Sequence, residues 1–399
     1  MANLFRRHYI SRMEEVEAPS AIKQREFGFL FFEGKTMLRH IAFDDVGRLR
    51  HHLAENGPAH VYYSSAYYSA PEAEMEWKGW LGADLVFDID ADHIDTPCKA
   101  DHDRWWCNVC EMTGTGKAPE RCPRCGKAAF EEETWLCERC LHAAKYEAQK
   151  LLDFLIQDFG FHSKDLQVNF SGNRGYHVHV KSPHMKSLDQ LARREVVDYI
   201  MGTGIEPEFH GYSRTSVGLS ALSEKGWRGR MTKALYDYIG RATTDELENL
   251  KLGKESARRL LKERNEVLRV LRERHPSHIL VYIDPRSLSI LMEAAVKEQA
   301  SAIDTVVTTD LHRLIRLPNT LHGKTGWLSQ TIDIDELWDY DPLTSAIAFN
   351  EGTATVYIRR APRFRIGDEK YGPFEEERSE LPLAVSIFLL CRKAARLEA

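Results

Sequence analysis

Asp84-Leu85-Val86-Phe87-Asp88-Ile89-Asp90 is the stretch that decides the architecture of this chain. Most of its apolar side chains fall on one parity and its carboxylates fall on the other, which is the period-2 pattern of a half-buried strand. Asp88 and Asp90 therefore point the same way, roughly 7 Å apart along the strand. Crowded carboxylates repel one another unless a cation offsets their charge, so the stretch predicts a divalent-metal site. The stretch alone leaves open a solvated strand edge.

Length, composition and charge set the frame around this strand. The chain has 399 residues, of which 43% are hydrophobic, enough for a large core and for more than one folding unit. No apolar run approaches the roughly 18–20 residues of a membrane span, and the N-terminal segment lacks the apolar region of a secretory signal. Because the net charge is -6, any nucleic-acid contact requires a local basic patch.

Cysteines are concentrated in one short region. Seven of the eight lie between Cys98 and Cys140, in the paired spacing typical of metal sites. Two structural zinc sites are predicted, with the ligands Cys107, Cys110, Cys122 and Cys125 for one and Cys98, His102, Cys137 and Cys140 for the other. His93 or His142 could replace His102 in the second set. A four-ligand site leaves no open position for chemistry, so a structural role is favoured.

A second informative stretch runs from Val168 to Val180. Its alternating apolar residues flank the turn Ser171-Gly172-Asn173-Arg174-Gly175, which predicts a β-hairpin with His177 on an exposed face. The Ser171 hydroxyl, the loop amides and the planar Arg174 side chain suit a phosphate group. A simple turn without a ligand is the alternative.

The remaining elements are predicted from periodicity and capping signals. We expect strands at Phe27–Phe32 and Ala59–Tyr68, and helices at Ala42–Leu53 and Ala143–Phe159. From Ser187 to Ala300 a mainly helical insertion is predicted, with a capping box at Thr243–Glu246 and a charged helix at Lys254–His275. Its basic residues are interpreted as a solvated face, although contact with a nucleic-acid backbone is an alternative.

The segment 301–326 gathers ionisable residues of both signs. It holds two acids, two histidines, two arginines and a lysine, threaded by a short apolar run. The glycines on either side of Lys324 predict a loop on which this amine and the His322 imidazole project together. A positive cluster beside an acidic strand is what a nucleoside triphosphate and its metal ions require.

Three motifs now make the chain resemble a known family. Asp88-Ile89-Asp90, Ser171–His177 and His312–Pro318 with Leu321–Lys324 occur in the order seen in the small, catalytic subunit of archaeal and eukaryotic-type DNA primase, and the chain is most like the archaeal form. The resemblance implies an α/β (α+β) fold with a mixed-sheet catalytic core, a zinc-binding module and a mainly helical insertion. The implied segments are 1–186, including the zinc module at 98–140, then 187–300 and 301–399.

The resemblance also implies roles for individual residues. Asp88, Asp90 and Asp304 match the acids that hold catalytic Mg²⁺ or Mn²⁺, and Asp310 is the competing candidate for the third acid. The residues that match nucleotide-phosphate ligands are Ser171, Arg174, His177, His322 and Lys324, with Arg313 and Arg316 as supporting candidates. Cys137 and Cys140, with Cys98 upstream, match the family's structural zinc site, whereas the ribbon from Cys107 to Cys125 is a departure from it.

The implied activity is the synthesis of short RNA primers, or DNA ones, on single-stranded DNA during replication, in complex with a large primase subunit. A cytoplasmic, nucleoid-associated location is expected, or a nuclear one in a eukaryote, with no membrane partner. Two alternatives remain: a repair or damage-tolerance polymerase of the same superfamily, and a non-catalytic zinc-ribbon subunit that binds nucleic acid. The three acids argue against the second alternative, because a pure binding module has no use for carboxylates facing a polyanion.

Overall fold

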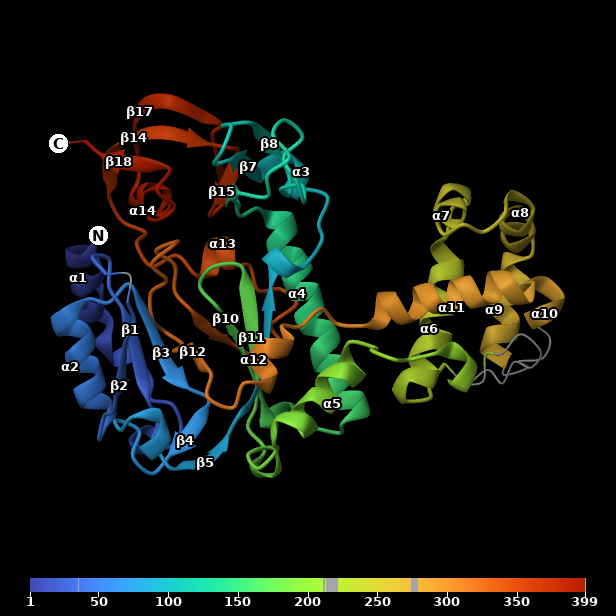
Figure 1. The fold of residues 1–399 in the computed structure, drawn as a ribbon, viewed down its shortest axis with the longest axis horizontal. Coiled ribbons are helices and arrows are strands. Elements are labelled where there is room, and N and C mark those ends of the chain that lie inside the picture. Colours follow the sequence, from blue (N-terminus) through green and yellow to red (C-terminus); the bar gives the residue numbers. More distant parts are fainter. Residues whose placement is uncertain (35, 211, 213–221, 274–278, 399) are drawn as a thin grey trace. The chain divides into compact units, whose positions relative to one another are not determined.

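The structure is a computed structural model that describes residues 1–34, 36–210, 212, 222–273 and 279–398, and it mixes helices with strands (Figure 1), as predicted. The helices are α1 (Ala2–Arg12), α2 (Val46–Asn56), α3 (Lys99–His102), α4 (Glu138–Asp153), α5 (Gln190–Ile200), α6 (Gly226–Arg241), α7 (Thr244–Asn249), α8 (Lys254–Lys262), α9 (Arg264–Glu273), α10 (Ile279–Tyr282), α11 (Pro285–Gln299), α12 (Thr305–Thr309), α13 (Pro342–Ser345) and α14 (Leu383–Cys391). Within the described ranges, none of them has the length and apolar character needed to cross a membrane.

The strands are β1 (Phe27–Leu30), β2 (Leu38–Ile41), β3 (His60–Ser64), β4 (Ala66–Tyr68), β5 (Trp80–Ala83), β6 (Leu85–Asp90), β7 (Arg104–Cys107), β8 (Thr113–Thr115), β9 (Phe130–Glu133), β10 (Leu166–Phe170), β11 (Gly175–Val180), β12 (Leu314–Arg316), β13 (Gln330–Ile332), β14 (Thr353–Ala361), β15 (Phe364–Ile366), β16 (Glu369–Tyr371), β17 (Phe374–Pro382) and β18 (Ala395–Leu397). All of these strands belong to one of two compact units, which comprises residues 1–149, 163–193 and 303–399. The second unit, residues 150–162 and 194–302, is helical where it is described. The division into segments 1–186, 187–300 and 301–399 stays a prediction.

Two four-stranded antiparallel sheets position the site in the first unit. Their strand orders are β12-β3-β1-β2 and β13-β10-β11-β6. The predicted hairpin is present, because β10 pairs with β11 in register from Leu166–Val180 to Phe170–Tyr176. On its other side β11 pairs with β6, and this register sets His177 opposite Asp88 and Gly175 opposite Asp90.

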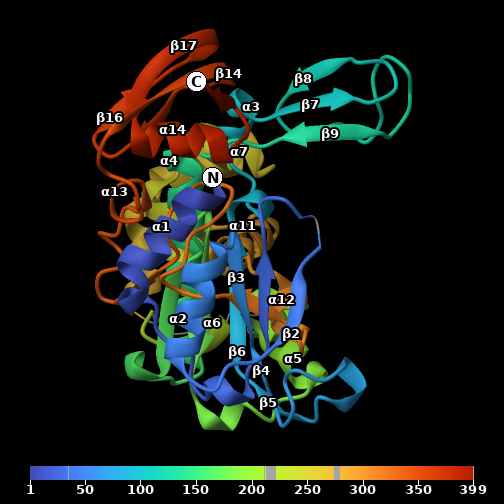
Figure 2. The same cartoon turned by 90° about the vertical axis from the view of Figure 1, so that its left-hand side faces the viewer.

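Helices α1 and α2 cover one face of the first sheet (Figure 2). Phe5 of α1 and Leu49 of α2 are fully buried in one apolar cluster with residues of β1 and β3. The Asp45 carboxylate caps α2 by accepting a 2.9 Å bond from the Arg48 amide, and Gly57 ends the helix at φ 56°. Val86 of β6 belongs to the same cluster, so the acidic strand is anchored in the core of the first sheet.

One expectation about exposure is wrong. His177, predicted on an exposed face, is only 7% exposed, and His179 two residues on is 4% exposed, because the first sheet covers this face of β11. The His179 ring stacks on Tyr63 of β3 with a centroid distance of 6.4 Å. Asp84 is also buried, where it accepts hydrogen bonds from Arg25 at 2.5 Å and Tyr67 at 2.7 Å, so it is a structural anchor.

Several predicted elements have different boundaries. The expected strand Ala59–Tyr68 is two strands of different sheets, β3 and β4, because the chain changes sheet at Ser65. The charged helix Lys254–His275 is broken between α8 and α9 at Glu263, and residues 274–275 lie outside the described part. Helix α2 begins after the Asp45 cap rather than at Ala42. The capping box at Thr243 and Glu246 is confirmed.

Candidate functional site

The acids come from β6 and from the start of α12. Asp88 and Asp90 share one face of β6, and Asp304 is the N-cap of α12. The Asp304 backbone amide donates a 2.8 Å hydrogen bond to the Asp88 carbonyl oxygen, which fixes the two segments together across more than two hundred residues of sequence. The structure therefore brings together the three acids that the sequence singles out.

Asp88 has the most perturbed carboxyl group of the three. Burial, together with the neighbouring charges of Asp90 and Asp304, raises its pKa to about 7, while the charge of Arg313 opposes the shift. The Nε2 atom of His177 lies 3.5 Å from Oδ1 of Asp88. Burial holds the His177 pKa well below 6.5, so this imidazole is neutral at pH 7 and the contact is polar rather than an ion pair.

Asp310, the competing candidate, has a local role. Its Oδ1 atom accepts a 2.9 Å hydrogen bond from the His312 amide. Asp304 Oδ1 accepts from the Val306 amide at 2.8 Å as a helix cap, but the Asp304 backbone is joined to β6 and its charge acts on Asp88. The geometry thus favours Asp304 over Asp310 as the third acid of the cluster.

The glycine-bearing turn packs against the loop at 322–326. Ser171 Oγ accepts from the Gly175 amide at 3.1 Å, so this hydroxyl shapes the turn and its own hydrogen is left to donate elsewhere. Gly172 has φ +80°, and a Cβ on it would come within 2.9 Å of His322. Thr325 Oγ1 donates to the Gly172 carbonyl at 2.5 Å. Two of the predicted phosphate-binding motifs are therefore in direct contact.

Arg174 lies against the acidic strand. Its guanidinium forms ion pairs with Asp92 and, at 3.3 Å, with Asp90, and its Nη1 donates to Thr134 Oγ1 at 2.8 Å. The side chain is 8% exposed. A phosphate bound by Arg174 would have to compete with these two carboxylates.

Arg316 is the residue that sequence reasoning undervalued. It is 5% exposed, and its Nη2 donates to His60 Nδ1 at 2.9 Å and to Tyr62 Oη at 3.0 Å. Its Nη1 is buried without a hydrogen-bond partner, and no carboxylate within the described ranges forms an ion pair with it. Burial lowers its pKa, and its charge acts on both His177 and His322. An arginine inside an apolar strand, Leu314-Ile315-Arg316, was the available signal.

His322 and Lys324 lie beside Arg316. His322 is 6% exposed and its ring meets that of His60 edge-on at 4.8 Å. Burial, with Arg316 as the next cause, holds the His322 pKa well below 6.5, so the ring is neutral. Its Nδ1 accepts from the Lys324 amide at 3.2 Å, while the Lys324 side chain is exposed. This contact involves the Lys324 backbone amide, so the expectation that the side-chain amine and the imidazole project together stays a prediction.

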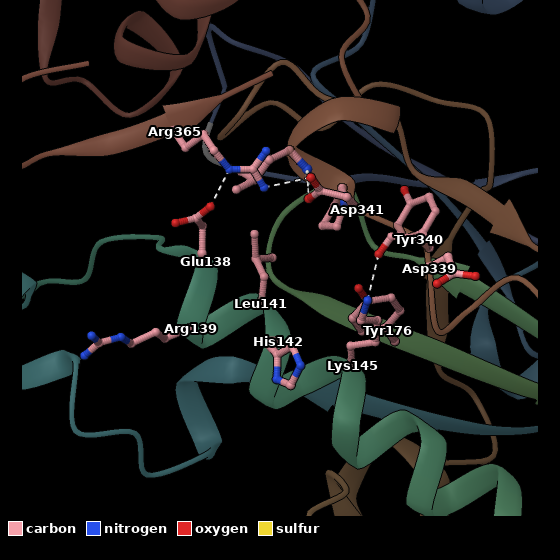
Figure 3. A pocket seen from close by; sticks show the side chains of 12 residues that line it. Glu138, Arg139, Leu141, His142, Lys145, Tyr176, Asp339, Tyr340, Asp341 and Arg365 are labelled. Carbon is pink, nitrogen blue, oxygen red and sulfur yellow. Dashed lines mark hydrogen bonds and ion pairs between the residues drawn. The ribbon is translucent and has the colours of Figure 1, made fainter. Parts of the chain in front are cut away.

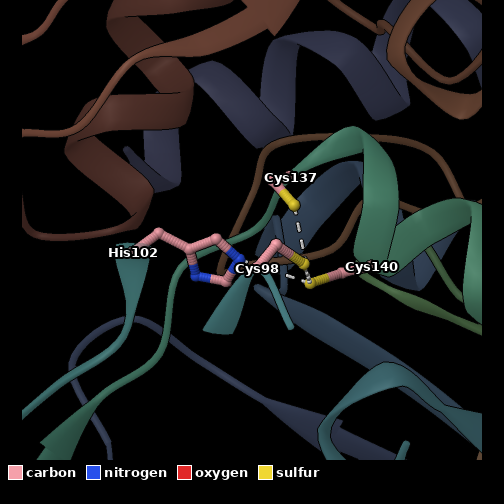
Figure 4. Close-up of side chains that lie close together, drawn as sticks. All are labelled: Cys98, His102, Cys137 and Cys140. Carbon is pink, nitrogen blue, oxygen red and sulfur yellow. Dashed lines mark hydrogen bonds between the residues drawn. The ribbon is translucent and has the colours of Figure 1, made fainter. Parts of the chain in front are cut away.

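Two clusters of cysteine and histidine have the ligand geometry of zinc sites. The first contains Cys98, His102, Cys137 and Cys140 (Figure 4), and the second contains Cys107, Cys110, Cys122 and Cys125, with all ligand atoms of each within 4.8 Å of one another. Sulfur separations of 3.5–3.6 Å in both clusters approach the roughly 3.8 Å expected around tetrahedral zinc. His93 and His142 are in neither group. Both clusters could hold zinc.

His102 has the outer partner typical of a metal-bound histidine. Its Nε2 lies 3.4 Å from Cys140 Sγ, and its Nδ1 lies 2.7 Å from Asp103 Oδ1. A carboxylate in this position orients the imidazole toward a metal. This favours His102 over the two alternative histidines.

A separate cavity of about 330 Å³ lies on the other face of β11, between α4 and the segment 339–343 (Figure 3). Tyr176, which alternates with His177 along β11, lines it. Arg365 lies in one wall of the cavity, where it forms ion pairs with Glu138 and, at 2.7 Å, with Asp341. The acids of β6 do not line this cavity, so it is distinct from the carboxylate cluster.

Comparison with known proteins agrees with the motifs. Residues 118–334 match a family model described as DNA primase small subunit. The chain is 31% identical to the DNA primase small subunit PriS of Cenarchaeum symbiosum, over 99% of this chain and 97% of the relative. It is 34% identical to PriS of Methanothrix thermoacetophila, covering 97% and 95%, and 35% identical to PriS of Methanoregula boonei, covering 95% and 94%.

Proposed function

The chain belongs to the DNA primase small-subunit family, and from this premise we propose that it is the catalytic subunit of a primase that joins nucleotides into short primers on single-stranded DNA. The proposed catalytic core combines segments 1–186 and 301–399, with 187–300 as an insertion. Asp88 and His177 come from the first segment and Asp304 and Arg316 from the last, and all four belong to one compact unit.

One observation carries this proposal: the cluster holds surplus charge of both signs side by side. Asp88 is crowded by Asp90 and Asp304, which helps to raise its pKa to about 7. Arg316 is buried, its charge interacts with Asp88, and its Nη1 has no hydrogen-bond partner in the part of the chain that is described. A metal-bound nucleoside triphosphate carries the complementary charges, cationic at the metal and anionic at the phosphates. A purely structural cluster would pair its own charges.

The donor set fits Mg²⁺ or Mn²⁺, which prefer carboxylate oxygens. Asp88, Asp90 and Asp304 would hold these ions. Bound there, the ions would offset the charge of the triphosphate and lower the pKa of the attacking 3′-hydroxyl. The raised pKa of Asp88 supports this assignment, because burial and the nearby charges of Asp90 and Asp304 disfavour its carboxylate unless a cation is bound.

The protein's own contribution is to position the phosphates. Among the described residues, neither Arg316 Nη1 nor Nδ1 of the neutral His177 has a hydrogen-bond partner, and both atoms are buried. The exposed Lys324 adds a positive charge from the loop that Thr325 ties to the Gly172 turn. Positioning and charge stabilisation are most of what a protein adds to phosphoryl transfer. Ser171, Arg174 and His322 are proposed to complete this set.

We further propose that the two cysteine clusters bind structural zinc, that a primase large subunit is the partner, and that the complex works in the cytoplasm on nucleoid DNA. Archaeal relatives that carry the small-subunit name support the last two statements. A repair polymerase of the same superfamily would use the same acids, and it differs in requiring a pre-existing primer.

The proposal is tested by nucleotide binding in the presence of Mg²⁺ or Mn²⁺. Wild-type protein should bind ATP only with a divalent ion, and Asp88→Ala should abolish that binding. Asp310→Ala is the matched control, because this carboxylate caps its own loop, and it should bind as wild type does. Equal metal-dependent binding by Asp88→Ala and wild type would contradict the proposal.

A further inference from the structure

The ribbon, defined as β7, β8, β9 and their connecting loops (residues 104–133), plays no part in the chemistry proposed above. Figure 2 shows it standing out as an arm from the rest of its unit. It has a small core of its own, in which the Trp105 ring meets Phe130 edge-on at 5.3 Å and packs on Gly114, where a Cβ would approach the indole to 2.4 Å. The arm is therefore an ordered element.

The four cysteines of the ribbon lie close together at its far end. Cys107 Sγ lies 3.6 Å from Cys125 Sγ, and Cys110 Sγ lies 3.6 Å from Cys122 Sγ. The knuckle around Cys122 is closed by a 2.9 Å hydrogen bond from its amide to the Lys127 carbonyl. Side chains on this knuckle are thus held in a defined arrangement.

That knuckle carries three exposed cations. Arg121, Arg124 and Lys127 occur within seven residues, and each is exposed. The Arg124 Nη1 contacts the Cys110 carbonyl at 3.4 Å, and within the described ranges none of the three forms an ion pair with a carboxylate. These three residues are called the ribbon tip. A cluster of unpaired cations on a rigid projection suits a flexible polyanion.

Three of the ribbon's five glutamates lie on β9, and the other two, Glu111 and Glu120, flank the cysteine knuckles. Glu131, Glu132 and Glu133 are consecutive and exposed, and Glu132 accepts a 3.0 Å hydrogen bond from the Ala118 amide. Five basic and five acidic residues make the ribbon neutral as a whole, and the ribbon tip is where three of its cations are grouped. Net charge alone would not reveal this site.

The root of the ribbon reaches the carboxylate cluster. Thr134, the residue after β9, accepts a 2.8 Å hydrogen bond from Arg174, which pairs with Asp90. A cleft of about 520 Å³ runs between the segment Asp92–Lys99 and the ribbon residues Arg104, Lys117 and Glu132. This cleft lies between the root of the ribbon and the segment that directly follows the acidic strand.

We propose that the ribbon tip binds the phosphodiester backbone of the nucleic acid on which the carboxylate cluster works. This inference rests on the proposed function for the identity of the strand. The contacts are to phosphates only, so they add affinity without base preference. A protein partner that docks on the tip is the competing occupant.

The test uses full-length, zinc-loaded protein and fluorescence anisotropy with labelled single-stranded DNA at several salt concentrations. The triple variant Arg121→Ala, Arg124→Ala, Lys127→Ala should weaken binding about tenfold at low salt. It should also reduce the slope of log affinity against log salt by about 2, roughly 0.7 for each lost phosphate contact. The control variant Arg7→Ala, Lys23→Ala, Lys370→Ala removes the same charge from exposed positions elsewhere and should keep the wild-type slope.

A parallel titration with a primer–template duplex identifies the strand. A slope change with single-stranded DNA alone places the template on the tip, and one with the duplex places the product there; both support the proposal. Unchanged affinity and slope with both probes would overturn it, and so would equal losses in the control variant. If the triple variant loses zinc, Arg124→Gln with Lys127→Gln replaces it under the same criteria.

Failure of this inference is distinguishable from failure of the proposed function. Addition of one nucleotide to an annealed primer, at saturating DNA, should be unchanged in the triple variant. Asp88→Ala should lose that addition while it keeps the wild-type salt slope for single-stranded DNA.

Discussion

The carboxylate cluster and the cysteine clusters both crowd groups that repel one another when ionised, yet they are built differently. In each cysteine cluster four ligand atoms lie within 4.8 Å and face inward on one point. The acids are spread over β6 and α12, and Asp90 and Asp304 each also accept a hydrogen bond from a backbone amide nearby. The charge of Arg316 acts on Asp88, and within the described residues its Nη1 has no hydrogen-bond partner. A closed set of ligands holds a structure together, whereas an open set with unpaired charge awaits a substrate.

The largest effect expected from this comparison is on activity. Asp88→Ala or Asp90→Ala should lower the rate of nucleotide transfer by about 10³-fold or more, because each removes a ligand of the proposed metal ions. The melting temperature should not fall. Rate assays and thermal unfolding of the same preparations measure the two effects, and a variant that keeps its activity would remove the distinction between the clusters.

Substitutions in the cysteine clusters are expected to lower stability. Cys137→Ser should lower the free energy of unfolding by about 3 kcal/mol or more and reduce the zinc content, because structural zinc contributes directly to folding. Cys110→Ser in the ribbon should also lose one zinc but unfold only the ribbon. Zinc content by mass spectrometry, with thermal unfolding, checks both. Unchanged zinc in Cys137→Ser would show that the ligand set is wrong.

Arg316 provides a sharper separation of function from stability. Arg316→Met should lower kcat/KM for nucleotides by about 100-fold, since a buried donor to phosphate is lost. The melting temperature should stay the same or rise, because a buried cation without a carboxylate partner is costly. Steady-state kinetics and calorimetry test this. A large loss of stability with unchanged kcat/KM would show that Arg316 has a structural role, as the cysteine clusters do, and does not bind the nucleotide.

The smallest effect is the pH dependence of stability. The Asp88 pKa is raised to about 7 from 3.8, so the folded protein binds the proton more tightly than the unfolded chain. Its carboxylate therefore destabilises the metal-free fold progressively between about pH 4 and pH 7, and by a constant amount above that. Asp88→Asn should raise the stability of metal-free protein at pH 8 by about 2 kcal/mol, after allowance for partial exposure, and by nothing near pH 4. Denaturant unfolding at both pH values measures it.

The sequence predicted correctly those elements that are stabilised by residues close to one another in the chain. The hairpin at Val168–Val180 follows from alternation around a glycine-bearing turn, and the Thr243 capping box follows from a four-residue pattern. The break at Glu263 and the change of sheet at Ser65 have no such signal, because tertiary packing decides them. Burial of His177 likewise depends on a sheet that is distant in sequence.

The same limit applies to the site. Asp88 and Asp90 were predictable because a strand places them on one face, and the cysteine ligand sets follow from knuckle spacing. The free donor of Arg316 was not predictable, because it depends on which carboxylates fail to reach it. The use of the Ser171 hydroxyl by its own turn is also a matter of tertiary geometry. Spacing predicts which residues gather, and packing decides which of them remain unpaired.

The central claim is tested most directly by synthesis on unprimed single-stranded DNA with labelled ATP and mixed nucleotides. Wild-type protein, alone and with a large subunit, is compared with the double variant Asp88→Ala, Asp90→Ala. Short labelled products are expected from wild type and none from the double variant. Products from the double variant, or extension of an annealed primer by wild type with no synthesis on unprimed DNA even in the presence of the large subunit, would contradict it.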